Sequence, residues 1–285
     1  MNSPDISARL LAARAFLFDL DGTLVLGDKN NKNLEVLPGA VELLGLLESR
    51  QIPYGVLTNG TVRPPAAYTL RLRESGLRIP EQRMMTPSTV AADYFSARGS
   101  KTIFVLGVEG VWKPLRDAGL QVILPSDNDA DSETADAVFV GWCREIHMDD
   151  IEAACNAVWN GAGLYAASLV PFFATKNGRA LGSSRAISAM ITSVTGRRAT
   201  ALGKPSQHAL RSAARRLGCK PSELVVVGDD PELEVRMALR GKALAVAVQT
   251  GIAGADDVAK LATKDQPQLA LTGVQDLLEI LQRIQ

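Results

Sequence analysis

The chain has 285 residues, of which 46% are hydrophobic and 22% charged, as in globular proteins large enough for one big core or two. Its 31 basic and 31 acidic residues cancel, so no net charge favours nucleic acid as a partner. The three cysteines are far apart and odd in number, which argues against a disulfide framework and a thiolate metal site.

Nothing in the sequence indicates export or membrane insertion. Residues 1–14 contain Asp5, Arg9 and Arg14 and lack the continuous apolar core of a secretory signal. No apolar run approaches the ~18 residues that span a bilayer. We therefore expect a cytoplasmic protein with no membrane partner.

Short apolar runs alternate along the chain with amphipathic segments. The runs are typical of strands covered on both faces, and the segments have the three- and four-residue apolar spacing of helices. In chain order, we expect strands at 15–18, 54–57, 102–106, 137–140, 163–167, 199–202, 224–227 and 243–248, and helices at 40–50, 67–75, 149–157 and 207–217. This alternation predicts an α/β fold with a doubly wound, Rossmann-like parallel sheet.

Four of the predicted strands end in polar residues. In such a sheet, ligands bind beyond the carboxyl ends of the strands, so these residues are the candidate site. We expect all four strand ends to converge on one edge. They are 19–21 (DLD), 58–60 (TNG), 203–205 (GKP) and 228–230 (GDD).

The residue types suit a metal and a phosphate. Asp19 and Asp229, if close, repel each other unless a cation lies between them, and carboxylate oxygens are ligands that Mg²⁺ prefers. Lys204, Thr58 and the backbone N–H groups of Asn59 and Gly60 are suited to a phosphate placed against that metal.

These four motifs, in this order, resemble those of the haloacid dehalogenase-like hydrolase superfamily. The resemblance implies that Asp19 attacks phosphorus and that Asp21 protonates the leaving oxygen, then deprotonates the attacking water. It implies Mg²⁺ held by Asp19, the backbone carbonyl of Asp21 and Asp229, and a phosphoryl group oriented by Thr58 and Lys204.

The spacing of the motifs indicates the subgroup. Only 38 residues separate Asp19 from Thr58, whereas 145 separate Thr58 from Lys204, which leaves room for an inserted α/β domain. This resembles subfamily IIA, with its 4-nitrophenyl, phosphoglycolate, pyridoxal and nucleotide phosphatases. We expect a catalytic core at 1–87 plus 198–285 and a cap that selects the substrate at 88–197.

Several positions leave alternatives open. Asp230 is interpreted as a helix cap or as support behind the metal ligands, and Glu234, where the family usually has Asp, as a second supporting carboxylate. Lys220 has the same Lys-Pro-Ser context as Lys204, but it follows a helix, so we interpret it as a surface turn. The cap departs from the family pattern at 141–143 and 168–172, which leaves the substrate open.

The predicted function is a Mg²⁺-dependent phosphatase acting on a small phosphorylated metabolite, such as a sugar, nucleotide, phosphoglycolate or pyridoxal phosphate. The alternatives are a phosphotransferase of the same superfamily and a binding or regulatory protein with little turnover. The sequence leaves the oligomeric state open, with a homo-oligomer among the alternatives.

Overall fold

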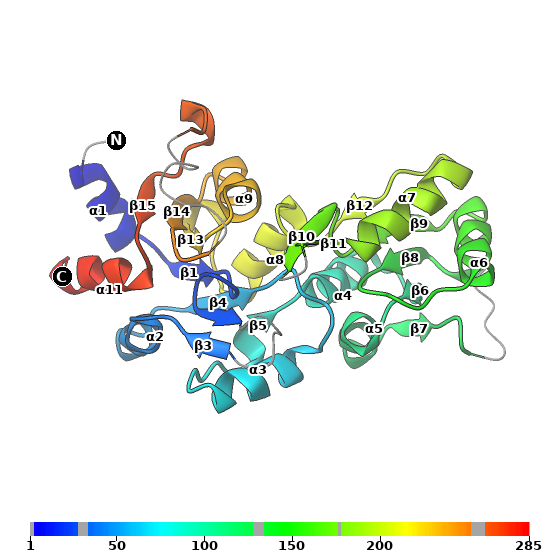
Figure 1. Ribbon diagram of the computed structural model, residues 1–285, viewed down its shortest axis with the longest axis horizontal. Coiled ribbons are helices and arrows are strands. Elements are labelled where there is room, and N and C mark those ends of the chain that lie inside the picture. Colours follow the sequence, from blue (N-terminus) through cyan, green and yellow to red (C-terminus); the bar gives the residue numbers. More distant parts are fainter. Residues whose placement is uncertain (1–2, 28–33, 128–133, 176–177, 252–259, 285) are drawn as a thin grey trace. The chain divides into compact units, whose positions relative to one another are not determined.

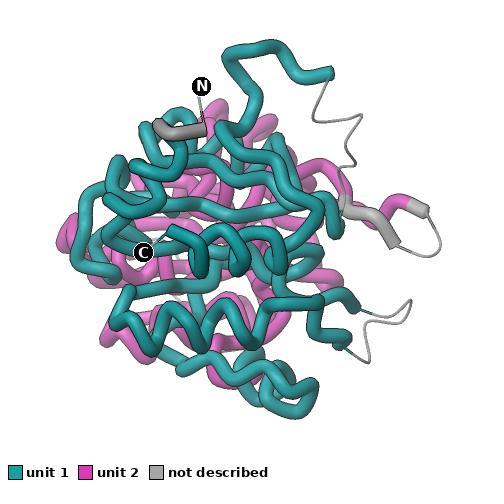
Figure 2. Tube along the Cα trace, turned by 90° about the vertical axis from the view of Figure 1, so that its left-hand side faces the viewer, with its two compact units in different colours: residues 1–58, 68–85, 209–285 teal, residues 59–67, 86–208 magenta. Residues whose placement is uncertain are grey.

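The structure, a computed structural model, describes residues 3–27, 34–127, 134–175, 178–251 and 260–284 (Figure 1). The chain divides into two compact units, coloured separately in Figure 2. The first unit comprises residues 1–58, 68–85 and 209–285, and the second comprises 59–67 and 86–208. The second unit is thus inserted into the first.

A six-stranded parallel sheet forms the centre of the first unit. The chain begins in the middle of this sheet and builds it outward in both directions, which is the doubly wound arrangement predicted from the sequence. Most of its strands are apolar and buried throughout, as strands covered on both faces must be. In spatial order they are β15 (Leu269–Leu271), β14 (Leu244–Val248), β13 (Leu224–Gly228), β1 (Ala15–Phe18), β4 (Tyr54–Leu57) and β5 (Met84–Met85) (Figure 1).

Two helices of the first unit pack against each other beside this sheet. Leu43 and Leu47 of α2 (Ala40–Ser49) and Leu277 of α11 (Val274–Arg283) are buried in the same core cluster. Each fully buried leucine contributes roughly 1.5–3 kcal/mol relative to an exposed one. Gly39, before α2, has φ +80°, and a Cβ there would lie 2.7 Å from the Cα of Gln275.

The other elements of this region lie outside the sheet. An antiparallel hairpin follows β1, and single-turn helices precede several strands. They are the hairpin β2 (Val25–Gly27) and β3 (Leu34–Val36), the helices α1 (Ser3–Leu11), α3 (Pro65–Glu74), α8 (Gln207–Arg216) and α9 (Arg236–Arg240), and the short turns η1 (Glu81–Arg83), η3 (Pro221–Glu223), η4 (Pro231–Val235) and η5 (Thr263–Asp265).

The second unit has its own five-stranded parallel sheet. Its spatial order is β12 (Thr200–Ala201), β9 (Gly163–Ala166), β8 (Ala137–Val140), β6 (Thr102–Leu106) and β7 (Gln121–Ile123). A separate core cluster joins this sheet to two of the unit's helices. The helices are α4 (Pro87–Arg98), α5 (Glu109–Asp117), α6 (Met148–Trp159) and α7 (Ser183–Thr195), and a hairpin is formed by β10 (Phe172–Thr175) and β11 (Gly178–Leu181).

One predicted strand lies in the other sheet. We expected 199–202 to end at the same sheet edge as Asp19, but β12 pairs with β9 of the second unit. The pairing continues past the strand, because Leu202 N donates to Ala166 O and Gly203 N to Ala167 O, each at 2.9 Å. Convergence of four strand ends on one sheet edge is therefore wrong, and Lys204 follows a strand of the second unit.

The helices of the described ranges are short. None of them combines the length and the apolar character that crossing a membrane requires.

Candidate active site

Asp19 and Asp229 lie at the point where the doubly wound sheet reverses its order. Asp19 directly follows β1 and Asp229 directly follows the last strand residues of β13, and these two strands are parallel neighbours. The ladder continues into the acids, because Asp19 N donates to Val227 O at 2.8 Å. Such a reversal point opens a crevice beyond the carboxyl ends of the strands, where ligands of these folds bind.

Three buried carboxylates meet at this point. Asp19, Asp229 and Glu234 each offer an oxygen, and the three atoms lie within 4.8 Å of one another. The side chains are only 7%, 3% and 2% exposed. Three negative charges this close and this dry repel one another unless a cation neutralises them, and oxygen donors suit Mg²⁺. The donor set therefore fits a divalent cation.

A π-helical turn delivers Glu234 to this cluster. Asp230 caps η4, its Oδ1 accepting from Glu232 N at 2.8 Å. Glu234 Oε2 accepts from Asp230 N at 3.1 Å, which fixes the side chain against the start of the turn. Gly228 makes room for this side chain, since a Cβ there would lie 2.6 Å from the Cβ of Glu234. Glu234, expected to stand behind the ligands, thus contributes its own oxygen to the cluster.

Asp21 differs from Asp19 in its environment. Asp21 is exposed, whereas Asp19 is buried. The hydroxyl of buried Thr58, directly after β4, donates to Asp21 Oδ2 at 3.5 Å. Thr58 itself is fixed by its backbone N–H, which donates to Met85 O at 3.2 Å. The two acids of the first motif are therefore placed for different tasks, one in a dry cluster and one open to solvent.

The segment after β14 contains two site residues that were absent from the sequence interpretation. The Thr250 hydroxyl donates to Gly22 O at 2.5 Å. A Cβ on Gly251 would lie only 2.5 Å from Asp229 Cγ and closer still to its Oδ2, so this position has no room for a side chain. Their signal in the sequence was the same as for the other motifs, a polar residue and a glycine just past a predicted strand.

Lys204, Asn59 and Gly60 belong to the second unit. Lys204 is 3% exposed, and the side chain of Asn59 brackets its backbone. Asn59 Oδ1 accepts from Lys204 N at 2.8 Å, and Asn59 Nδ2 donates to Lys204 O at 3.0 Å. Lys220, by contrast, is exposed at the turn before η3, as predicted.

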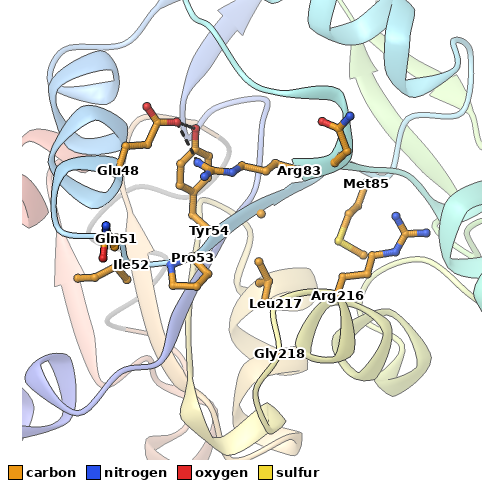
Figure 3. A pocket seen from close by; sticks show the side chains of 12 residues that line it. Glu48, Gln51, Ile52, Pro53, Tyr54, Arg83, Met85, Arg216, Leu217 and Gly218 are labelled. Carbon is orange, nitrogen blue, oxygen red and sulfur yellow. Dashed lines mark hydrogen bonds and ion pairs between the residues drawn. The ribbon is translucent and has the colours of Figure 1, made fainter.

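A cavity of about 730 Å³ lies at the other end of β4 (Figure 3). In it, Glu48 accepts from the Tyr54 hydroxyl and pairs with Arg83, both at 2.9 Å. Burial first, then the bond to Glu48, raise the pKa of Tyr54 to about 12, so the phenol keeps its proton at neutral pH. None of the acids of the site lines this cavity, and Tyr54 and Thr58 lie at opposite ends of β4.

Two family models match the chain over the segments that hold these residues. The model described as haloacid dehalogenase-like hydrolase matches residues 16–121, and one described as HAD-hydrolase-like matches residues 201–277. The first segment contains Asp19, Asp21 and Thr58, and the second contains Lys204 and Asp229.

Known phosphatases resemble the chain over nearly its whole length. It is 28% identical to a dihydroxyacetone phosphatase of Corynebacterium glutamicum over 93% of this chain and 90% of that protein. It is 27% identical to an acid sugar phosphatase of Staphylococcus epidermidis over 86% of this chain and 90% of that protein. Among solved structures, a variant of the thermostable p-nitrophenylphosphatase of Bacillus stearothermophilus has a TM-score of 0.79, with 28% identity over 93% of this chain and 98% of that one.

Proposed function

Because the chain belongs to the haloacid dehalogenase-like hydrolases, we propose that it is a Mg²⁺-dependent phosphatase that hydrolyses small phosphomonoesters through an aspartyl-phosphate intermediate. The observation that carries this proposal is the buried cluster of Asp19, Asp229 and Glu234 at the reversal point of the sheet. The names of the relatives, which are phosphatases of small phosphorylated compounds, support the same activity.

Asp19 and Asp21 divide the covalent chemistry between them. An oxygen of Asp19 attacks phosphorus while the bond from phosphorus to the leaving oxygen breaks, and Asp21 gives that oxygen its proton. Asp21 then takes a proton from a water molecule, which attacks the same phosphorus and releases inorganic phosphate and free Asp19. The exposed position of Asp21 suits this proton exchange with solvent.

The remaining site residues bind the cation and balance the negative charge of the phosphoryl group. Asp19, Asp229, the backbone carbonyl of Asp21 and, from its position in the cluster, Glu234 would hold Mg²⁺. When bound, the cation supplies positive charge beside the phosphoryl group. The Thr58 hydroxyl, the N–H groups of Asn59 and Gly60, and the Lys204 ammonium would meet the phosphoryl oxygens.

We further propose that residues 1–87 and 198–285 act as the catalytic core and 88–197 as the cap that selects the substrate. The two compact units support this division in outline, although they assign 59–67, 86–87 and 198–208 to the inserted unit. The relatives named for dihydroxyacetone and sugar phosphates make these compounds the first substrate candidates. The cytoplasmic location stays a prediction.

A steady-state assay with 4-nitrophenyl phosphate, with and without Mg²⁺, tests the proposal. We expect turnover that EDTA abolishes and that Asp19→Asn eliminates, while the matched surface variant Asp117→Asn behaves as wild type. Asp117 is exposed on α5, where it pairs with Lys113 at 2.9 Å. Turnover that survives Asp19→Asn would refute the mechanism.

The same preparation separates the alternatives. An added alcohol that takes the phosphoryl group faster than water does would identify a phosphotransferase. A panel of phosphorylated metabolites that all fail, in a protein that binds Mg²⁺, would favour a binding or regulatory role.

A further inference from the structure

Thr250 lies at the same sheet edge as the acids and reaches the turn that follows Asp21. It stands two residues beyond β14, the strand next to β13. Its hydroxyl donates to the carbonyl of Gly22, 228 residues earlier in the chain, at 2.5 Å. The turn of the first motif is therefore tied to a strand end on the other side of β13.

Gly22 is the residue of that turn with a left-handed backbone conformation. Its φ is +82°, in the left-handed region that favours glycine. The peptide unit before Gly22 contains the Asp21 carbonyl, and its N–H donates to Val25 O at 2.7 Å. The peptide unit after Gly22 is the one that Thr250 holds. Rotation at Gly22 is thus opposed from both sides, once within the turn and once by Thr250.

The residues after β14 also lie close to Asp229, an acid of the buried cluster. Gly251 approaches Asp229 so closely that no side chain fits there, and its Cα lies 2.9 Å from the position that a Cβ on Gly22 would take. The methyl group of Thr250 faces Gly273, since a Cβ there would lie 3.2 Å from Thr250 Cγ2. Thr250 is therefore oriented by packing, with its hydroxyl toward the turn.

We propose that Thr250 is a positioning residue: its hydrogen bond to Gly22 holds the Asp21 carbonyl and side chain in the arrangement that metal binding and phosphoryl transfer need. This role rests on the proposed function. A hydrogen bond of this kind contributes about 0.5–1.5 kcal/mol, and its loss corresponds to a change of roughly 3- to 10-fold.

The test compares two substitutions at this position. Thr250→Val keeps the size and the methyl group but removes the donor, whereas Thr250→Ser keeps the donor. The control is Thr195→Val in α7, which removes a hydroxyl that donates to Ile191 O at 2.8 Å, in the second unit. Mg²⁺ affinity is measured by calorimetry, kcat and KM with 4-nitrophenyl phosphate, and unfolding by urea without metal.

We expect Thr250→Val to weaken Mg²⁺ binding by roughly 3- to 10-fold and to lower kcat more than it changes KM. Thr250→Ser restores both, and Thr195→Val changes neither. Wild-type Mg²⁺ affinity and kcat in Thr250→Val would overturn the proposal, as would a serine variant as impaired as the valine one. If the wild type hydrolyses no phosphomonoester, the proposed function fails, but the Mg²⁺ affinities of the variants still decide the role of Thr250.

Discussion

Replacing Gly251 by alanine tests whether the close approach of this residue to Asp229 matters for the site. The added Cβ would lie 2.5 Å from Asp229 Cγ, whereas real Cβ contacts shorter than 3.0 Å essentially never occur. Because the φ of Gly251 lies outside the left-handed region, alanine brings no backbone strain of its own. The effect of this substitution is therefore purely steric.

The size of the effect follows from the displacement. Either the carboxylate of Asp229 or the backbone at Gly251 must retreat by about 1 Å, and a misplacement of about 1 Å costs on the order of 100-fold in rate. We expect kcat/KM to fall by about this factor, roughly 2.7 kcal/mol of transition-state stabilisation, with a parallel loss of Mg²⁺ affinity.

The assay is turnover of 4-nitrophenyl phosphate over a Mg²⁺ titration, with Gly45→Ala as the control. Gly45 lies in α2, nothing lies within 4 Å of its Cβ position, and alanine there favours the helix by up to about 1 kcal/mol. The control should keep full activity. If Gly251→Ala also keeps wild-type kcat/KM and Mg²⁺ affinity, the position of Asp229 does not affect metal binding or turnover. That result would contradict its proposed role as a metal ligand.

Three further substitutions probe single groups. Asp21→Asn should slow turnover strongly yet leave Mg²⁺ affinity nearly unchanged in calorimetry, because the metal ligand proposed for Asp21 is its backbone carbonyl and not its side chain; weak metal binding would contradict that role. The Thr23 hydroxyl is buried without a hydrogen-bond partner among the described residues, so Thr23→Val should raise the free energy of unfolding in urea by about 1 kcal/mol, and a loss of stability would argue against this. Two hydrogen bonds from Thr272, the hydroxyl first, lower the pKa of Asp276, so the carboxylate stabilises the fold above its unfolded pKa of about 3.9 and loses this effect as pH falls through the lower folded value. Asp276→Ala should therefore destabilise the fold by more at pH 7 than at a pH below the folded pKa, and an equal loss at both would refute the electrostatic explanation.

Most strands of this chain, and the acids at two strand ends, could be predicted because they follow from local sequence. The run Ala15–Phe18 is apolar throughout and ends in acids, so its burial and its polar end follow from neighbouring residues alone. The same holds for Leu224–Gly228 and Asp229. Parallel strands place their carboxyl ends together, which brought Asp19 and Asp229 to one point in the prediction as in the structure.

What could not be predicted depends on partners far away in the sequence. The residues Thr200–Ala201 form a strand in any reading, but only the pairing with Tyr165 and Ala166 decides which sheet it joins. The position of Glu234 depends on a π-helical turn, which no local sequence pattern predicted. The hydrogen bond from Thr250 to Gly22 joins residues 228 positions apart in the sequence, and no local pattern at either residue predicts it.

Trapping the covalent intermediate tests the central claim most directly. Wild-type protein is mixed with Mg²⁺ and 4-nitrophenyl phosphate, quenched in acid within its first turnover, and reduced with borohydride, which converts an aspartyl phosphate to homoserine. Peptide mass spectrometry then locates the modified residue. We predict modification at Asp19, lost when Mg²⁺ is omitted and absent from Asp19→Asn. Turnover of the substrate with no modified Asp19, or with the label on another residue, would contradict the proposed mechanism.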